Sequence, residues 1–150
     1  ATDSLCHNDV AARNFILTPE GEAALIDFDA MRPGPPLFDL WKIFRRALAR
    51  LDWSWEVGLA MLEAYGEISP FSPTELLGLL GLLTFPHKLW RLVRRFHRAG
   101  EEGEKRKYAR RIHRLWDQTR PYGQFLFDLA ALCRAKGARM NEELPVLEDR

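Results

Sequence analysis

Three prolines within six residues divide this chain into two unlike parts. The stretch Met31-Arg32-Pro33-Gly34-Pro35-Pro36 cannot form a helix, because proline lacks the backbone N–H that an internal helical turn requires. We therefore expect a loop there. Before it, apolar residues occur in short runs of strand length, and after it they recur at steps of three and four residues. The sequence predicts a small β region followed by a larger helical region, an α+β fold that is mostly α.

The residues before the prolines predict a β-hairpin. The apolar runs Phe15-Ile16-Leu17 and Ala23-Ala24-Leu25-Ile26 have the length of strands. Between them, Thr18-Pro19-Glu20-Gly21 has proline in the second and glycine in the fourth position, as a type I turn prefers. Because a hairpin returns the chain to its starting point, we expect the residues that flank it to lie close together.

The residues after the prolines predict helices separated by start and stop signals. A first apolar stripe lies within residues 40–51. A second helix begins at a capping residue, either Asp52 or Ser54, and runs to about Tyr65, where Gly66 ends it.

Three further helical segments follow. Ser72-Pro73-Thr74-Glu75 combines a capping serine, a proline at the first helical position and a glutamate at the third, which is a strong start signal. Phe85-Pro86 ends that helix, and a basic helix over residues 88–98 follows. A last pattern over residues 101–136 contains Pro121, which should kink the helix or split it in two.

Size and composition indicate one folded domain with a helical core. The chain has 150 residues and a mass of 17.4 kDa, with 47% hydrophobic and 29% charged residues, which excludes a disordered protein. It contains no apolar run of about 18 residues and no signal-peptide pattern, so we expect no membrane span. Cys6 and Cys133 lack metal-binding or disulfide spacing, which favours a reducing compartment. The core is expected to contain the leucine-rich third helix with Trp41, Trp90 and Trp116.

Positive charge is concentrated in one part of the chain. Residues 88–114 hold 11 of the 22 Lys and Arg but only 3 of the 21 acids, a local charge of +8 that leaves about −7 for the rest. Two amphipathic helices with basic outer faces explain this pattern best. A surface for nucleic acid or another polyanion is the alternative. Because no recognised nucleic-acid motif occurs, a nucleic-acid partner is not expected.

Residue types required for phosphoryl transfer flank the predicted hairpin. His7-Asn8-Asp9-Val10-Ala11-Ala12-Arg13-Asn14 has the form H-x-D-x-x-x-x-N, and Asp27-Phe28-Asp29 begins 13 residues after Asn14. Phosphoryl transfer needs one carboxylate to orient and deprotonate a hydroxyl, and an amide oxygen and a second carboxylate to hold magnesium. Magnesium prefers oxygen ligands and keeps several waters, so one or two protein carboxylates suffice. Each element alone is a weak signal, but together they are specific.

Four neighbouring residues are expected to support this constellation. His7 fits a buried hydrogen-bonding anchor for the loop better than a proton-transfer group. Asp39, at the start of the first helix, is expected to hold the loop. Asp29 is either a second carboxylate on the metal side or a loop cap, and Arg13 lies within the motif itself. Residues that bind the nucleotide remain unassigned.

These motifs resemble the C-terminal lobe of the kinase-like superfamily. Residues 7–14 are similar to the H-R-D-L-A-A-R-N loop of protein tyrosine kinases, but those kinases continue with D-F-G, a long activation segment and A-P-E. Here Asp27-Phe28-Asp29 is followed by only the proline-rich stretch and Phe38-Asp39-Leu40-Trp41. The short link resembles the aminoglycoside phosphotransferase and choline kinase branch instead.

Within that branch, the sequence is most similar to the CotS family of spore-coat kinase-like proteins. Leu25-Ile26-Asp27-Phe28-Asp29 resembles the family's I-D-x-D, and Phe38-Asp39-Leu40-Trp41-Lys42-Ile43 resembles its D-L-x-K-[LI]. Phe85-Pro86-His87-Lys88-Leu89-Trp90-Arg91 resembles an F-P-x-x-x-W-[KR] segment. The resemblance covers residues 5–135, and the sequence departs from it at Asn8, where relatives usually carry Gly or Gln.

The resemblance implies a chemistry and a location. Asp9 would be the catalytic base, Asn14 and Asp27 the metal ligands, and Mg²⁺ and ATP the cofactors. The partners would be a nucleotide, a hydroxyl acceptor and spore-coat proteins. The location would be the cytoplasm or the spore coat of a spore-forming bacterium.

The resemblance also implies a missing part. In kinases a glycine-rich loop and a lysine of the N-lobe hold the ATP phosphates, and neither pattern occurs here. We expect residues 1–137 to form the C-lobe and residues 138–150 a polar tail, with the N-lobe in a longer protein. The chain alone should bind ATP poorly. The expected function is a phosphotransferase of the CotS and aminoglycoside phosphotransferase type. The alternative is a non-catalytic structural component of the spore coat, against which the retained Asp9, Asn14 and Asp27 count.

Overall fold

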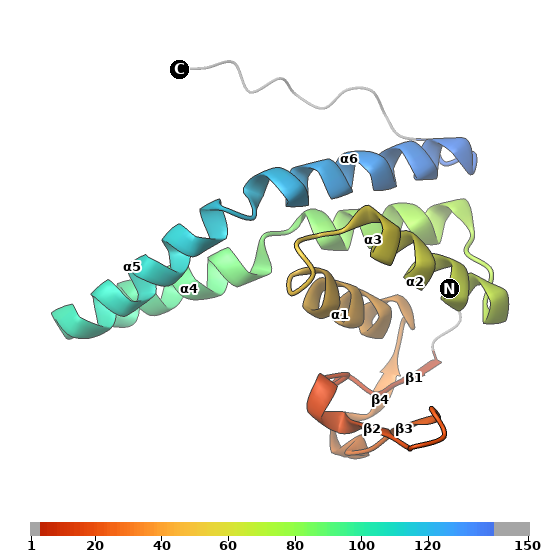
Figure 1. Cartoon of the computed structure of the whole chain (residues 1–150), viewed down its shortest axis with the longest axis horizontal. Coiled ribbons are helices and arrows are strands. Elements are labelled where there is room, and N and C mark those ends of the chain that lie inside the picture. The colour runs from red at the N-terminus through yellow and green to blue at the C-terminus, as the bar shows by residue number, and fades with distance from the viewer. Residues whose placement is uncertain (1–3, 140–150) are drawn as a thin grey trace.

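The computed structural model describes residues 4–139 and has a mostly helical α+β fold (Figure 1). Four short strands come first, accompanied by two 3-10 turns: β1 (Ser4–Cys6), η1 (Ala12–Asn14), β2 (Phe15–Leu17), β3 (Ala23–Leu25), η2 (Phe28–Ala30) and β4 (Arg32–Gly34). Helices make up the rest of the described chain: α1 (Leu37–Leu48), α2 (Trp55–Ile68), α3 (Pro73–Thr84), α4 (His87–Arg98), α5 (Glu102–Trp116) and α6 (Thr119–Ala135). The predicted fold class is confirmed. Residues 140–150, most of the expected tail, lie outside the described residues.

The predicted hairpin is formed by β2 and β3. The two strands are antiparallel, with Phe15 opposite Leu25 and Leu17 opposite Ala23. The backbone N–H of Gly21 donates to the Thr18 carbonyl at 3.0 Å and closes the turn. Gly21 has a φ of 88°, a conformation that glycine adopts without a Cβ clash.

The expected loop over residues 31–36 is partly wrong. Residues 32–34 form β4, which pairs antiparallel with β1 so that Leu5 faces Pro33 and Cys6 faces Arg32. A proline fits a two-stranded sheet, because both strands are edge strands and a position whose N–H would point away from the partner strand makes no ladder hydrogen bond. The fixed φ of proline also suits extended backbone. The strand holds the proline-rich stretch beside β1, directly before the 7–14 segment.

Most helix signals are confirmed, with two shifts of position. The Ser54 side chain accepts from the Val57 N–H at 3.3 Å, so Ser54 and not Asp52 caps α2, which continues through Gly66. Ser72 and Glu75 form the predicted capping box of α3. The long pattern divides between Trp116 and Thr119, before Pro121, which lies in the first turn of α6, where a missing N–H costs nothing.

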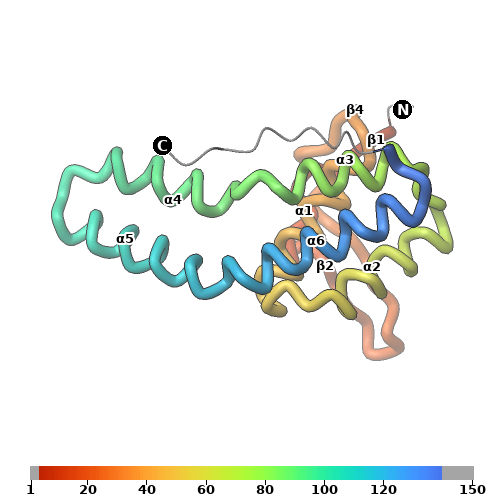
Figure 2. The backbone as a smooth tube through the Cα atoms, turned by 90° about the horizontal axis from the view of Figure 1, so that it is seen from above, coloured from red at the N-terminus to blue at the C-terminus, as the bar shows by residue number. Residues whose placement is uncertain are grey.

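Helices α1, α3 and α6 enclose the hydrophobic core, which α2 completes. The fully buried side chains come from these helices: Phe44, Leu48, Leu79, Leu83, Phe125, Leu129 and Cys133. The leucines of α3 are therefore core residues, as expected. Trp90 and Trp116, however, are 44% and 77% exposed, so their assignment to the core is wrong. Their helices explain the difference, because α4 and α5 pack on each other and project from the body (Figure 2).

The stretch Pro73–Arg98 has the length of a membrane-spanning helix and contains an 18-residue window whose mean hydropathy, 1.2, is also high enough. In the structure it consists of two helices, α3 and α4, separated at Phe85-Pro86. Its apolar half buries four leucines in the core. We interpret the apolar half as a core helix.

Candidate active site

The segment between β1 and β2, residues 7–14 (the 7–14 loop), begins with a buried histidine. His7 is 6% exposed, and its Nε2 is 2.9 Å from the carbonyl oxygen of Ile26 at the end of β3. The His7 ring also packs on Phe28, with 4.9 Å between ring centroids. These contacts fasten the start of the loop to the end of the β2–β3 hairpin.

The other side of the loop is fastened to α1 by Asp39. The Asp39 carboxylate accepts from the backbone N–H of His7 at 2.6 Å and from that of Asn8 at 2.9 Å. Lys42, one turn further along α1, donates to the backbone and side-chain oxygens of Asn8, each at 3.0 Å, and lies 3.4 Å from Asp39. Asn8 has a left-handed φ of 65°, which this set of bonds holds in place. We call these contacts the Asp39–Lys42 clamp.

The loop presents Asp9 next to Asn14. Asn14 is 3% exposed, and its Nδ2 donates to the Asp9 carbonyl at 2.8 Å and to Asp9 Oδ2 at 3.3 Å. The Asp9 side chain is 28% exposed, so its carboxylate is held by Asn14 and is still accessible to solvent. The Asp9 N–H donates to His7 Nδ1 at 3.3 Å.

Two arginines contact the Asp9 carboxylate. Arg13, 66% exposed, pairs with Asp9 Oδ2, and Nη2 of Arg46 lies 3.6 Å from Asp9 Oδ1. Sequence reasoning assigned no role to Arg46 or Lys42. Asp39, Lys42 and Arg46 are spaced by three and four residues on α1, which is the spacing of one helix face. This spacing was the only sequence signal for the roles of Lys42 and Arg46. It points to the site only when the position of the 7–14 loop against this face of α1 is known.

Asp27 lies beside Asn14 because the hairpin brings it there. The N–H of Ile26 donates to the Asn14 carbonyl at 2.9 Å, so Asp27 is one residue beyond the position opposite Asn14. Asp27 has a left-handed φ of 68° and is exposed. Within residues 4–139 its carboxylate has no hydrogen bond or ion pair. Asp29, in η2, is also exposed, and within the described residues no hydrogen bond joins it to Asp9, Asn14 or Asp39.

The donors present suit a magnesium ion. The Asn14 amide nitrogen is committed to Asp9, which leaves its Oδ1 as an acceptor, and Asp27 adds a carboxylate without another partner. No group of three or more His, Cys, Asp and Glu that could hold a metal occurs in the described part of the chain. One amide oxygen and one carboxylate do not suit zinc, but magnesium needs few protein ligands and keeps its waters.

Comparison with known proteins identifies the family. Residues 1–78, more than half of the chain, match the phosphotransferase enzyme family known as APH. The chain belongs to this family. The matched region includes the 7–14 loop, the hairpin, Asp27 and the Asp39–Lys42 clamp. A search of curated proteins finds no match.

A solved structure extends the likeness of this APH-family chain beyond the matched region. The chain resembles an aminoglycoside phosphotransferase from Alicyclobacillus acidocaldarius subsp. acidocaldarius DSM 446, with a TM-score of 0.80 and 25% sequence identity. The likeness covers 89% of this chain but only 39% of that one. The helices after residue 78 thus share the relative's arrangement, and the chain corresponds to part of a phosphotransferase.

Proposed function

We propose that this APH-family chain is the C-terminal lobe of an ATP- and Mg²⁺-dependent phosphotransferase that acts on a hydroxyl acceptor. One observation carries the proposal. Asn14 connects Asp9 and Asp27, 18 positions apart in the sequence. Its side-chain amide donates to Asp9, and its backbone carbonyl accepts from the N–H of Ile26, the residue before Asp27. We assign residues 1–137 to this lobe and residues 138–150 to a polar tail.

Asp9 would act as the catalytic base. Its carboxylate is held by Asn14 from one side and remains partly open to an acceptor hydroxyl. A carboxylate in this position orients the hydroxyl and accepts its proton as the phosphoryl group is transferred. The contact with Arg13 is exposed, and exposed ion pairs contribute about 0–1 kcal/mol, so an incoming acceptor can displace it.

Asn14 Oδ1 and Asp27 would hold the magnesium ion. Bound magnesium supplies positive charge that bridges the phosphates of ATP and offsets the charge that develops during transfer. His7, Asp39 and Lys42 would act as positioning residues, since each fixes the loop without touching the open face of Asp9. Asp29, which lacks a contact to the site, would be a loop residue or a second metal-side carboxylate.

The CotS branch is the finer assignment that we propose. The D-L-x-K-[LI] similarity, residues 38–43, contains both Asp39 and Lys42, and these residues hold Asn8, the position at which the chain departs from relatives. Because Asn8 is hydrogen-bonded to Asp39 and Lys42, its difference from the relatives is compatible with a catalytically competent loop. This assignment places the protein in the cytoplasm or the spore coat of a spore-forming bacterium, with coat proteins as partners. A non-catalytic coat component is the alternative function.

Phosphoryl transfer by the full-length protein tests the proposal. We expect labelled phosphate from ATP to appear on an alcohol acceptor, in a panel of hydroxy acids, amino alcohols and sugars. Asp9→Ala should lower the rate by about 10²- to 10⁴-fold, the usual effect of removing a general base. Asp128→Ala, which removes a carboxylate on α6 whose partner is Gln124, is the matched control and should keep the rate. A rate that Asp9→Ala leaves unchanged would exclude Asp9 as the base.

A further inference from the structure

Four buried nitrogen atoms near the candidate active site have no hydrogen-bond partner within residues 4–139. They belong to α1 and to the start of α4: Trp41 Nε1, Arg45 Nε, Arg46 Nη1 and His87 Nδ1. A buried polar atom left without a partner is destabilising, because it loses its hydrogen bonds to water and gains none in the protein. Four in one region are a cost that folding alone does not explain, and they suggest a ligand that supplies the missing acceptors.

Three of these side chains are neighbours of one another, and Arg46 is next to Arg45 in α1. The rings of Trp41 and His87 are 5.8 Å apart, and the Arg45 guanidinium lies 5.3 Å from the centre of the Trp41 ring. Arg46 follows Arg45 and reaches Asp9 with its Nη2, while its Nη1 is the unpartnered atom. We call Trp41, Arg45, Arg46 and His87 the donor cluster. Through Arg46 it is continuous with the proposed catalytic carboxylate.

The positive charge of Arg45 is not balanced by an acid of the described chain, whereas Arg46 is paired with Asp9. Four ion pairs occur within residues 4–139, and none includes Arg45, His87 or Arg91. Burial lowers the pKa of Arg45, and the neighbouring charges of Arg46 and Arg91 lower it further. Burial and the charges of Arg45 and Arg91 likewise lower the pKa of His87. An anion would relieve this repulsion and also supply acceptors.

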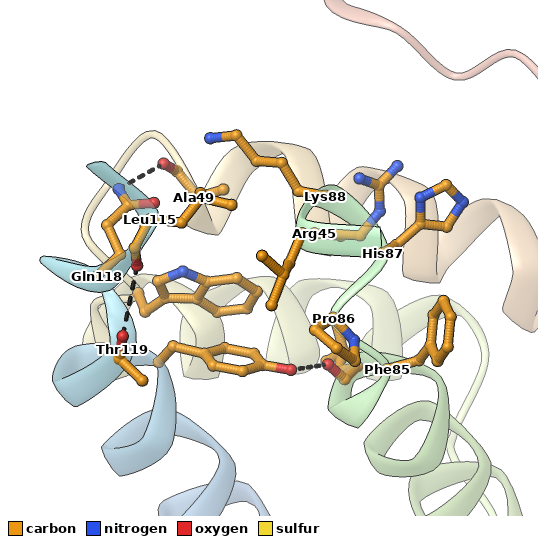
Figure 3. A pocket seen from close by; sticks show the side chains of 13 residues that line it. Arg45, Ala49, Phe85, Pro86, His87, Lys88, Leu115, Gln118 and Thr119 are labelled. Atoms are coloured by element: carbon orange, nitrogen blue, oxygen red, sulfur yellow. Dashed lines mark hydrogen bonds between the residues drawn. The ribbon is translucent and has the colours of Figure 1, made fainter. Parts of the chain in front are cut away.

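A cavity of about 160 Å³ opens beside the cluster. Arg45, His87 and Lys88 are among its lining residues, and Figure 3 shows Arg45 and His87 next to each other, opposite Gln118 and Thr119. Trp41 and Arg46 do not line it. Apolar side chains, among them Trp53, Leu83 and Leu115, line the remainder. A dry cavity of about 150 Å³ can hold a ring the size of benzene. The cavity is thus mostly apolar and is bordered on one side by Arg45 and His87 of the donor cluster.

We propose that the donor cluster binds an anionic group, a carboxylate or a phosphate, of the acceptor substrate. The apolar part of the acceptor would enter the cavity, and its hydroxyl would face Asp9 on the other side of Arg46. This inference rests on the proposed function, which it extends to the class of acceptor. The same positive charge disfavours an acceptor with ammonium groups, such as an aminoglycoside.

Binding of small probes, measured without ATP, tests the inference independently of catalysis. The intact protein is labelled with ¹⁵N at its tryptophan indoles, and Trp41→Phe identifies the signal of Trp41. Benzoate and phenyl phosphate should shift this signal in a saturable way and distinguish carboxylate from phosphate by their affinities. Benzyl alcohol and benzylammonium, of similar shape but neutral or positive, should leave it in place.

Substitutions locate the site. Arg45→Gln should weaken binding of the anions at least tenfold, and His87→Gln should weaken it less. Arg94→Gln is the matched control, because Arg94 lies 4.6 Å from the ring centre of Trp90 on α4 but outside the cluster. If Arg45→Gln fails to fold, Arg45→Lys replaces it. This variant keeps the positive charge but lacks Nε, and it should also weaken binding of the anions.

Each outcome separates the two proposals. An unmoved Trp41 signal with both anions, an equal shift with benzylammonium, or unchanged affinity in both Arg45 variants would overturn the inference. Anion binding at Trp41 without any phosphoryl transfer would contradict the proposed function and leave the anion site intact. Transfer that prefers amino alcohols over hydroxy acids would contradict the anion site alone.

Discussion

Asn14 is the residue on which the candidate site depends. Its buried amide fixes Asp9 through two hydrogen bonds from Nδ2, and its carbonyl ties the loop to Ile26, next to Asp27. The sequence was sufficient to predict the hairpin between Asn14 and Asp27, because its turn residues were readable. It did not predict Arg46 or Lys42, since charged residues on a helix ordinarily indicate a solvated face, and their contacts depend on the loop.

Asp27 allows structure and function to be separated at a single residue. Its carboxylate is exposed, has no partner within the described residues, and has a left-handed backbone that asparagine tolerates. Asp27→Asn should therefore change the free energy of unfolding by less than about 0.5 kcal/mol. It should nevertheless abolish magnesium-dependent nucleotide binding by the full-length protein. Calorimetric titration together with urea unfolding measures both, and loss of stability without loss of binding would contradict the ligand role.

His87 gives a pH dependence of known sign. Its pKa lies below the ordinary value of 6.5, first because of burial and then because of Arg45 and Arg91. As pH falls below about 6.5, the unfolded chain takes up this proton before the folded chain does, so stability declines. The decline between pH 7.5 and 5.5 should be smaller in His87→Gln than in the wild type, as measured by urea unfolding. A His87 that titrates above 6.5 by NMR would reverse the sign.

At the scale of elements, the Asp39–Lys42 clamp couples α1 to the 7–14 loop. Asp39 and Lys42 are 17% and 18% exposed, so the contacts are partly shielded from water. Asp39→Ala leaves two backbone N–H groups without their acceptor and Lys42 without its carboxylate partner, and it should destabilise the fold by roughly 2–4 kcal/mol. Urea unfolding measures this loss.

A comparison with another acid of the chain gives the control for the clamp. Glu102, which pairs with Lys105 at the exposed start of α5, has the same i, i+3 spacing to a lysine. Glu102→Ala should cost no more than about 1 kcal/mol. Equal losses in the two variants would show that the clamp is an ordinary surface pair.

Local signals predicted the elements better than their pairing. The capping box at Ser72 and the turn at Gly21 determine structure through neighbours in the sequence, and both are formed. The strand of residues 32–34 was missed, since its proline argues against a strand and only the distant β1 stabilises it. Pro121 was expected to break the helix at its own position. The helices instead separate before Thr119, so that Pro121 lies in the first turn of α6, where proline is favoured.

At the scale of the whole molecule, the basic residues of α4 and α5 lie on a helix pair that projects away from the hydrophobic core. Helix α4 buries only Leu92 among its described residues, and α5 buries none. The apolar spacing of these helices predicted a core position for Trp90 and Trp116, but two helices that pack mainly on each other leave such positions open. The excess of basic residues within 88–114 therefore lies on a projection, as the expectation of solvated basic faces required.

The measurement that tests the account most directly is magnesium-dependent nucleotide binding by the full-length protein. Calorimetric titration with ATP, in excess magnesium and again with the metal chelated, compares the two states. We predict saturable binding that is lost with the metal and lost in Asp27→Asn. Binding that is indifferent to magnesium, or no binding under either condition, would contradict the catalytic account and favour a structural component of the spore coat.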